Sequence, residues 1–156
     1  NKTIFNLILL FSVFALIAAY FIQYVLKHQP CNLCLIERIP YFFSIIVISI
    51  CLFTKKFEKF SLMILSLIFF SAFLIAFYHF GIEQGFVRES LVCDLNNENN
   101  NLSKEALLNQ LKTMPVSCKD VTFRIFGLSL ATFNIFITLI FGVITIKLFL
   151  TYGKNR

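Results

Sequence analysis

The chain has 156 residues, of which 58% are hydrophobic and only 14% are charged, with 21 phenylalanines and no tryptophan. Soluble domains carry roughly 25% charged residues, so this composition argues against a water-soluble globule, and the low glycine and proline content argues against a collagen-like or disordered chain. The formal net charge of +6 would suit nucleic-acid binding only if the basic residues clustered on a soluble face. We therefore expect one integral membrane domain.

Four segments contain no Asp, Glu, Lys or Arg, and they cover residues 4–26, 39–54, 60–80 and 125–146. A helix needs about 20 apolar residues to cross a bilayer, so the second segment is long enough only if its helix begins near residues 33 to 35. The segments are apolar on every side, unlike the alternating strands of a β-barrel. The sequence predicts an all-α bundle of four transmembrane helices, at about 4–26, 34–54, 60–80 and 125–146.

A cleavable signal peptide is an alternative for the first segment. Its apolar run is longer than the 7–15 residues that are typical of such peptides, and it has no Ala-x-Ala cleavage site. We therefore interpret it as the first transmembrane helix.

The positions of the basic residues indicate the orientation, because cytoplasmic loops are enriched in Lys and Arg. Each side of the predicted bundle has seven basic residues, so the orientation is decided by how densely they are spaced. One side concentrates three lysines in a short turn, and its basic residues are Lys2, Lys55, Lys56, Lys59, Lys147, Lys154 and Arg156. We expect this side and both termini in the cytoplasm, with a short loop at about 27–33 and a long loop at about 81–124 in the periplasm.

Four of the five cysteines fall in the two outer loops, where disulfides persist. Spacing favours Cys31 with Cys34 and Cys93 with Cys118, among three possible pairings. The second pair can be either a structural staple or an electron relay. Cys51 lies inside the second span, where a small buried apolar residue is its simplest role.

A Cys-x-x-Cys pair forms a disulfide that exchanges easily, and its thiols become more acidic near a helix N-terminus or a cation. Arg38 follows Cys34 by four positions, so on a helix the guanidinium would share its face and stabilise a thiolate or a neighbouring anion. A structural disulfide and a zinc knuckle are alternatives. Zinc is disfavoured because a second close Cys or His pair is missing, since Cys93 and Cys118 lie 25 positions apart.

His79 lies near the outer end of the third span. Ionisable side chains within a membrane are costly and are therefore candidates for function, although a hydrogen-bonded structural histidine is the alternative. Arg38 is expected at a similar depth. Together the two residues predict a small polar pocket between helices that could hold a quinone head group.

Three stretches resemble the signatures of the disulfide bond formation protein B (DsbB) family. Residues 31–38 read Cys-Asn-Leu-Cys-Leu-Ile-Glu-Arg, like the family's Cys-x-Leu-Cys-x-x-Glu-Arg. Residues 78–85 resemble its Tyr-His-x-Gly-x-Glu run, and Phe-Gly-Leu-Ser at 126–129 resembles the segment before its fourth span. The chain departs from the family at Phe123, where relatives often have Trp, and in the Asn-rich stretch 96–101.

This resemblance implies a quinone-dependent thiol oxidase of the bacterial inner membrane. Cys93 would form a mixed disulfide with a periplasmic DsbA-like protein of thioredoxin fold, and Cys118 would resolve it. Electrons would then pass through Cys31 to Cys34, the cysteine nearest the quinone. The quinone would be ubiquinone or menaquinone.

The resemblance also implies two residues that bind the quinone. Arg38 would stabilise the Cys34 thiolate and the charge of the reduced quinone, and His79 would hydrogen-bond the quinone. We expect no metal ligands and no nucleic-acid partner. A vitamin K epoxide reductase-like protein would carry its quinone-proximal Cys-x-x-Cys in the last span, which here has no cysteine. A non-catalytic membrane protein with two structural disulfides is the other alternative.

Overall fold

The computed structural model describes residues 2–54, 57–88, 118–119, 124–125 and 127–152. Cys93 and the Asn-rich stretch 96–101 therefore lie outside the described residues, as does most of the predicted long loop. The described chain forms five helices and one two-stranded hairpin: α1 (Lys2–Tyr24), α2 (Asn32–Ile36), α3 (Ile39–Thr54), α4 (Glu58–Glu83), β1 (Arg124–Ile125), β2 (Leu128–Ser129) and α6 (Leu130–Tyr152).

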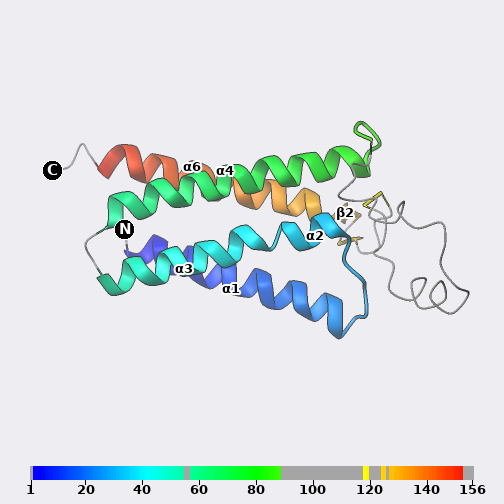
Figure 1. The fold of residues 1–156 in the computed structure, drawn as a ribbon, viewed down its shortest axis with the longest axis horizontal. Coiled ribbons are helices and arrows are strands. Elements are labelled where there is room, and N and C mark those ends of the chain that lie inside the picture. The colour runs from blue at the N-terminus through cyan, green and yellow to red at the C-terminus, as the bar shows by residue number, and fades with distance from the viewer. Residues whose placement is uncertain (1, 55–56, 89–117, 120–123, 126, 153–156) are drawn as a thin grey trace, which may run out of the picture.

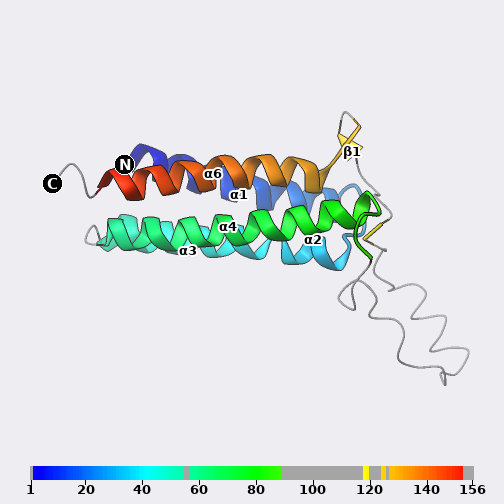
Figure 2. The same ribbon diagram turned by 90° about the horizontal axis from the view of Figure 1, so that it is seen from above.

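The long helices run up and down in one elongated bundle (Figures 1 and 2). Helix α1 packs against α3, α3 against α4, and α4 against α6. The start of α1 and the end of α6 lie at one end of the bundle, and α2 and the hairpin lie at the other (Figure 1). Four stretches are long and apolar enough to cross a membrane, which confirms the predicted all-α fold: Lys2–Tyr24, Asn32–Thr54, Glu58–Glu83 and Leu130–Tyr152.

The outer surface of the bundle is apolar. Phe53 is 89% exposed, Leu10 73% and Leu150 68%. Soluble proteins rarely expose apolar patches on this scale, so the solvent of this surface is lipid. Polar side chains instead face inward, as in the buried hydrogen bond between the hydroxyls of Ser12 and Ser44, at 3.0 Å.

The second span is divided into α2 and α3 by a break at Glu37 and Arg38. Pro40 explains this break, because it has no N–H for the carbonyl of Ile36 and its ring clashes with that carbonyl in a continuous helix. The backbone N–H of Arg38 bonds instead to the carbonyl of Leu35, at 3.2 Å. The break places two charged residues between two apolar helices.

Several helix ends differ from the expected bounds by two to six residues, among them the end of α4 and the start of α6. Helix α4 continues to Glu83 rather than Phe80, and Gly85 then adopts φ +77° while the N–H of Phe86 bonds to the carbonyl of Gly81 at 2.9 Å. This is a Schellman cap, which favours glycine at the left-handed position.

Helix α6 begins at Leu130 rather than residue 125, after the hairpin formed by β1 and β2. Gly127 turns this hairpin with φ +82°. The hydroxyl of Ser129 accepts a hydrogen bond from the N–H of Thr132 at 3.2 Å and caps the helix. The fourth span is therefore preceded by a hairpin and its turn, whose residues after Arg124 carry no charge and so were predicted as part of the helix.

Helices α4 and α6 make the main core contact. Phe69 is fully buried, and its ring centroid lies 5.4 Å from that of Phe141. Gly142 faces this core, because a Cβ added to it would lie in ordinary van der Waals contact with the Cβ of Phe69, at 3.9 Å. Cys51, predicted to be a small buried residue, lies in the same core cluster as a free thiol.

We expect Phe69→Ala to lower the thermal midpoint of the detergent-solubilised protein. The lost contact with α6 leaves a cavity, but lipid or detergent solvates exposed apolar surface in the unfolded state, so the cost should not exceed about 3 kcal/mol. Phe70→Ala is the matched control, because Phe70 is 55% exposed on the same helix. Equal shifts for the two variants would contradict the assigned packing.

Candidate redox site

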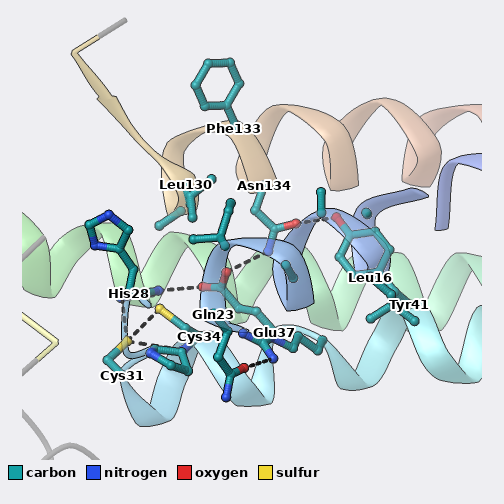
Figure 3. Close-up of a pocket in the computed structure, with 18 of the residues that line it drawn as sticks. Leu16, Gln23, His28, Cys31, Cys34, Glu37, Tyr41, Leu130, Phe133 and Asn134 are labelled. Atoms are coloured by element: carbon teal, nitrogen blue, oxygen red, sulfur yellow. Dashed lines mark hydrogen bonds and ion pairs between the residues drawn. The ribbon is translucent and has the colours of Figure 1, made fainter. Parts of the chain in front are cut away.

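The two sulfur atoms of the Cys-x-x-Cys pair lie side by side at the start of α2 (Figure 3). Their Sγ atoms are 2.8 Å apart, and both cysteines are free thiols. Cys31 caps the helix, because its sulfur accepts a hydrogen bond from the backbone N–H of Cys34 at 3.3 Å. The two thiols are thus placed to form a disulfide with each other.

His79 reaches from α4 to this pair. Its Nε2 lies 3.5 Å from the sulfur of Cys31, and its Nδ1 lies 2.7 Å from Oε1 of Glu37. A carboxylate on Nδ1 fixes the ring and directs Nε2 toward the thiol. Since His79 is only 2% exposed, this array of thiol, imidazole and carboxylate is shielded from solvent.

Glu37 connects three parts of the bundle. Its second oxygen, Oε2, accepts a hydrogen bond from the side-chain amide of Asn134 on α6 at 2.8 Å. The Tyr41 hydroxyl on α3 in turn donates to the amide oxygen of Asn134 (Figure 3). Both carboxylate oxygens of Glu37 are therefore occupied, one toward α4 and one toward α6.

Glu83 lies one turn beyond His79 on α4. Its Oε1 is 3.7 Å from Nε2 of His79, and its side chain is only 6% exposed. The other oxygen, Oε2, is buried and has no hydrogen-bond partner among the described residues. A buried oxygen without a partner is uncommon in folded proteins.

Arg38 points to the opposite side of the break. Its Nη1 donates a hydrogen bond to Oε1 of Gln23 on α1 at 2.6 Å, and its guanidinium lies 5.0 Å from the ring centroid of Tyr20. The sequence predicted that Arg38 shares a helical face with Cys34. Arg38 and Cys34 line the same pocket, and the guanidinium of Arg38 is held against α1.

A pocket of about 440 Å³ lies beside the thiols. Its apolar lining comes mainly from α1 and α6. Its polar lining includes Cys34, Glu37, Arg38 and His79, so the structure brings the predicted pair Arg38 and His79 to one pocket.

Comparison with known proteins identifies the family. A family model described as disulfide bond formation protein DsbB matches residues 1–148, nearly the whole chain. The chain belongs to the DsbB family. One relative is the uncharacterized protein RP370 of Rickettsia prowazekii (strain Madrid E), which is 28% identical over 156 residues that cover 98% of this chain and 90% of the relative. The predicted resemblance is thus confirmed, and DsbB membership implies a membrane protein with thiol–disulfide oxidoreductase activity.

Cys118 lies next to the Cys-x-x-Cys pair of this DsbB-family chain. It is disulfide-bonded, only 2% exposed, and buried in one cluster with Cys31, Leu33 and Ile82. It also contributes to the lining of the pocket. Three of the four predicted catalytic cysteines are therefore gathered at one end of the bundle, and the fourth, Cys93, lies outside the described residues.

Several site residues were not identified in the sequence analysis of this DsbB-family chain. Glu37 stands inside the Glu-Arg part of the signature, and Asn134 is a polar residue in a charge-free span, so each carried a signal. Glu83 belongs to the Tyr-His-x-Gly-x-Glu run. No motif in the sequence marks Gln23 or Tyr41, because their roles depend on which helix packs against them.

The pKa of the Cys31 thiol lies well below its ordinary value. The hydrogen bond with the Cys34 side chain lowers it most, burial opposes this effect, and the hydrogen bond and charge of His79 lower it further. A thiol with a lowered pKa keeps its reactive thiolate form at pH values where an ordinary cysteine is protonated. Cys31 is therefore the thiol of the pair that loses its proton more readily.

This environment predicts the pH profile of alkylation. In protein whose Cys31–Cys34 pair is reduced, Cys31 should react with iodoacetamide at about pH 6.5, roughly two units below an ordinary thiol pKa. His79→Asn should move the midpoint of the profile to higher pH, because it removes the charge that stabilises the thiolate. Peptide mass spectrometry would locate the label, with buried Cys51 as the internal reference. An identical profile in the variant would exclude His79 from this role.

Proposed function

We propose that the protein is a disulfide oxidase of the bacterial inner membrane. It reoxidises a periplasmic DsbA-like protein through Cys93 and Cys118, transfers the electrons to Cys31 and Cys34, and passes them to a membrane quinone, ubiquinone or menaquinone. The observation that carries this proposal is a partly buried dithiol at the edge of a largely apolar pocket inside a membrane bundle.

The shape and lining of the pocket suit a quinone. The small side chains of Ala15, Ala18 and Ala19 leave room along α1, and Ile137 lines the pocket from α6. Such a lining accommodates an isoprenoid tail, while polar residues next to the thiols suit the ring oxygens. Because both α1 and α6 contribute to the pocket, we infer that the tail reaches lipid between these two helices.

The polar residues have distinct roles under this proposal. A bound quinone would supply a sink for two electrons and take up two protons. Arg38 supplies a guanidinium that stabilises negative charge in the pocket. Cys34, which lines the pocket, is the cysteine next to the electron acceptor.

His79 accepts the proton that Cys31 releases, and Glu37 assists it. Oxidation of the dithiol to a disulfide releases two electrons and two protons. Nε2 of His79 accepts the Cys31 proton, and the Glu37 carboxylate on Nδ1 stabilises the resulting imidazolium. The balanced reaction converts a dithiol and a quinone into a disulfide and a quinol.

The second cysteine pair connects this centre to the partner. The partner's dithiol reduces the Cys93–Cys118 disulfide, and the resulting dithiol reduces the Cys31–Cys34 disulfide by exchange. The shared buried cluster of Cys31 and Cys118 supports this relay. It requires the cysteine end of the bundle to face the periplasm, with both termini in the cytoplasm, as the dense lysine turn indicates.

Energetics also favour a quinone as the acceptor. DsbA-type proteins are strong oxidants, with reduction potentials of about −120 mV, so their reoxidation needs an acceptor of still higher potential. A difference of about 30 mV corresponds to roughly 1.4 kcal/mol for two electrons. A glutathione pool is too reducing to serve, whereas a membrane quinone is a suitable sink.

Cys34→Ala should abolish quinol formation, because no disulfide can then form at the pocket. The test is anaerobic mixing of the purified protein with a reduced DsbA-like protein and quinone, followed by the quinol absorbance change. Cys93→Ala should stop oxidation of the partner while leaving the quinone pocket intact. Wild-type rates of partner oxidation in Cys93→Ala would contradict the relay.

Arg38→Met should raise the apparent KM for quinone severalfold, because the pocket loses its fixed positive charge. Arg88→Met is the matched control, since Arg88 is exposed and does not line the pocket. Initial rates at varied quinone concentration separate an effect on KM from one on kcat. An unchanged KM in Arg38→Met would remove Arg38 from the quinone site.

A further inference from the structure

The reduced Cys-x-x-Cys pair belongs to a larger set of metal-ligating groups. We propose that the dithiol form binds one Zn²⁺ ion through Cys31, Cys34, His79 and Glu83, and that this binding holds the centre inactive until the thiols are oxidised. Zn²⁺ replaces the two thiol protons, and no electrons are transferred. The sequence analysis disfavoured zinc because no second ligand pair was close in sequence, but His79 is close to the cysteines in space.

The ligand atoms are already gathered. The two sulfur atoms and a ring nitrogen of His79 all lie within 4.8 Å of one another. Zinc bonds of about 2.3 Å to sulfur and about 2.0 Å to nitrogen place tetrahedral ligands roughly 3.5 to 3.8 Å apart. The separation between Cys31 Sγ and His79 Nε2 is already 3.5 Å, while the two sulfurs, 2.8 Å apart, must separate by about 1 Å.

The groups behind His79 match those of a metal-bound histidine. A ligating histidine usually donates its other ring N–H to a carboxylate or carbonyl, which orients the free nitrogen toward the metal. Here Nδ1 of His79 donates to Glu37, and Asn134 holds the second oxygen of that carboxylate. The nitrogen that faces the sulfurs is therefore fixed before any ion arrives.

Glu83 would supply the fourth ligand after a movement of its side chain, because its carboxylate does not belong to the group of ligand atoms that all lie within 4.8 Å of one another. One of its carboxylate oxygens lies 3.7 Å from the ligating nitrogen of His79, and the other is buried with no hydrogen-bond partner among the described residues. Burying a carboxylate oxygen without a partner costs free energy, and a cation offsets this cost. The position is thus explained by a ligand that binds between the carboxylate and the thiols.

The chemistry of the ligands selects the metal. Two thiolates and an imidazole favour a borderline or soft ion such as Zn²⁺, whereas Mg²⁺ and Ca²⁺ require oxygen ligands. Binding also depends on redox state, because a disulfide between Cys31 and Cys34 removes two of the four ligands. Zinc would therefore inhibit only the reduced centre. This inference does not depend on a quinone or on a protein partner.

The test uses the full-length protein in detergent, fully reduced or oxidised, incubated with Zn²⁺ and then desalted. We expect one zinc per chain in the reduced protein and none after oxidation, measured by mass spectrometry of the metal. Cys31→Ser should lose the ion. Cys51→Ser should keep it, because that thiol lies in the other core cluster. Retention in Cys31→Ser would mean that other thiols bind zinc, and it would overturn the proposal.

Two isosteric variants test the site without removing a thiol. Glu37→Gln should weaken zinc affinity about 10- to 100-fold, the usual effect of losing a group that orients a ligand. Glu83→Gln should also weaken it, and Glu58→Gln, on the same helix at the other end of the bundle, should not. Co²⁺ is a spectroscopic probe, whose thiolate charge-transfer bands should vanish after oxidation. Equal affinity in all three variants, or bands that persist after oxidation, would show adventitious binding only.

Discussion

The arrangement of the site depends on one largely buried carboxylate, that of Glu37, whose side chain is 11% exposed. Glu37 accepts hydrogen bonds from His79 on α4 and from Asn134 on α6, and it lies in the break between α2 and α3. In lipid, helices gain little from the hydrophobic effect, so packing and interhelical hydrogen bonds of this kind determine how they assemble. The group that joins the helices is thus also the group that orients the imidazole next to Cys31.

This dual role connects stability to reactivity. An unpaired buried carboxylate would be costly, but both oxygens of Glu37 have partners, so the charge can be kept inside the bundle. The same carboxylate orients His79, whose hydrogen bond and charge favour a thiolate at Cys31. The lowered pKa of Cys31 is therefore a consequence of the hydrogen bonds that the polar groups inside the bundle make with one another. Glu83 is the exception, because one of its oxygens has no partner among the described residues.

The four membrane-crossing helices could be predicted from sequence, because backbone groups in lipid must be satisfied within helices and charge-free runs mark where that happens. Helix ends could not be predicted, because the rule stops at a charge while α4 continues to Glu83 and ends at the cap formed by Gly85. The cysteine motif was visible in the sequence. The contact between Cys31 and His79, 48 positions apart, was not, because it depends on how α2 packs against α4.

Glu37 and Arg38 are adjacent in sequence, at the break before Pro40, but they bind different helices around the pocket. Glu37 bonds to α4 and α6, while Arg38 is bound to Gln23 of α1. Under the proposed function, a proton that leaves Cys31 moves toward the carboxylate, and negative charge in the pocket is stabilised by the guanidinium. Under this function, the carboxylate toward which the proton moves and the guanidinium that stabilises negative charge thus lie next to each other in the sequence but contact different helices.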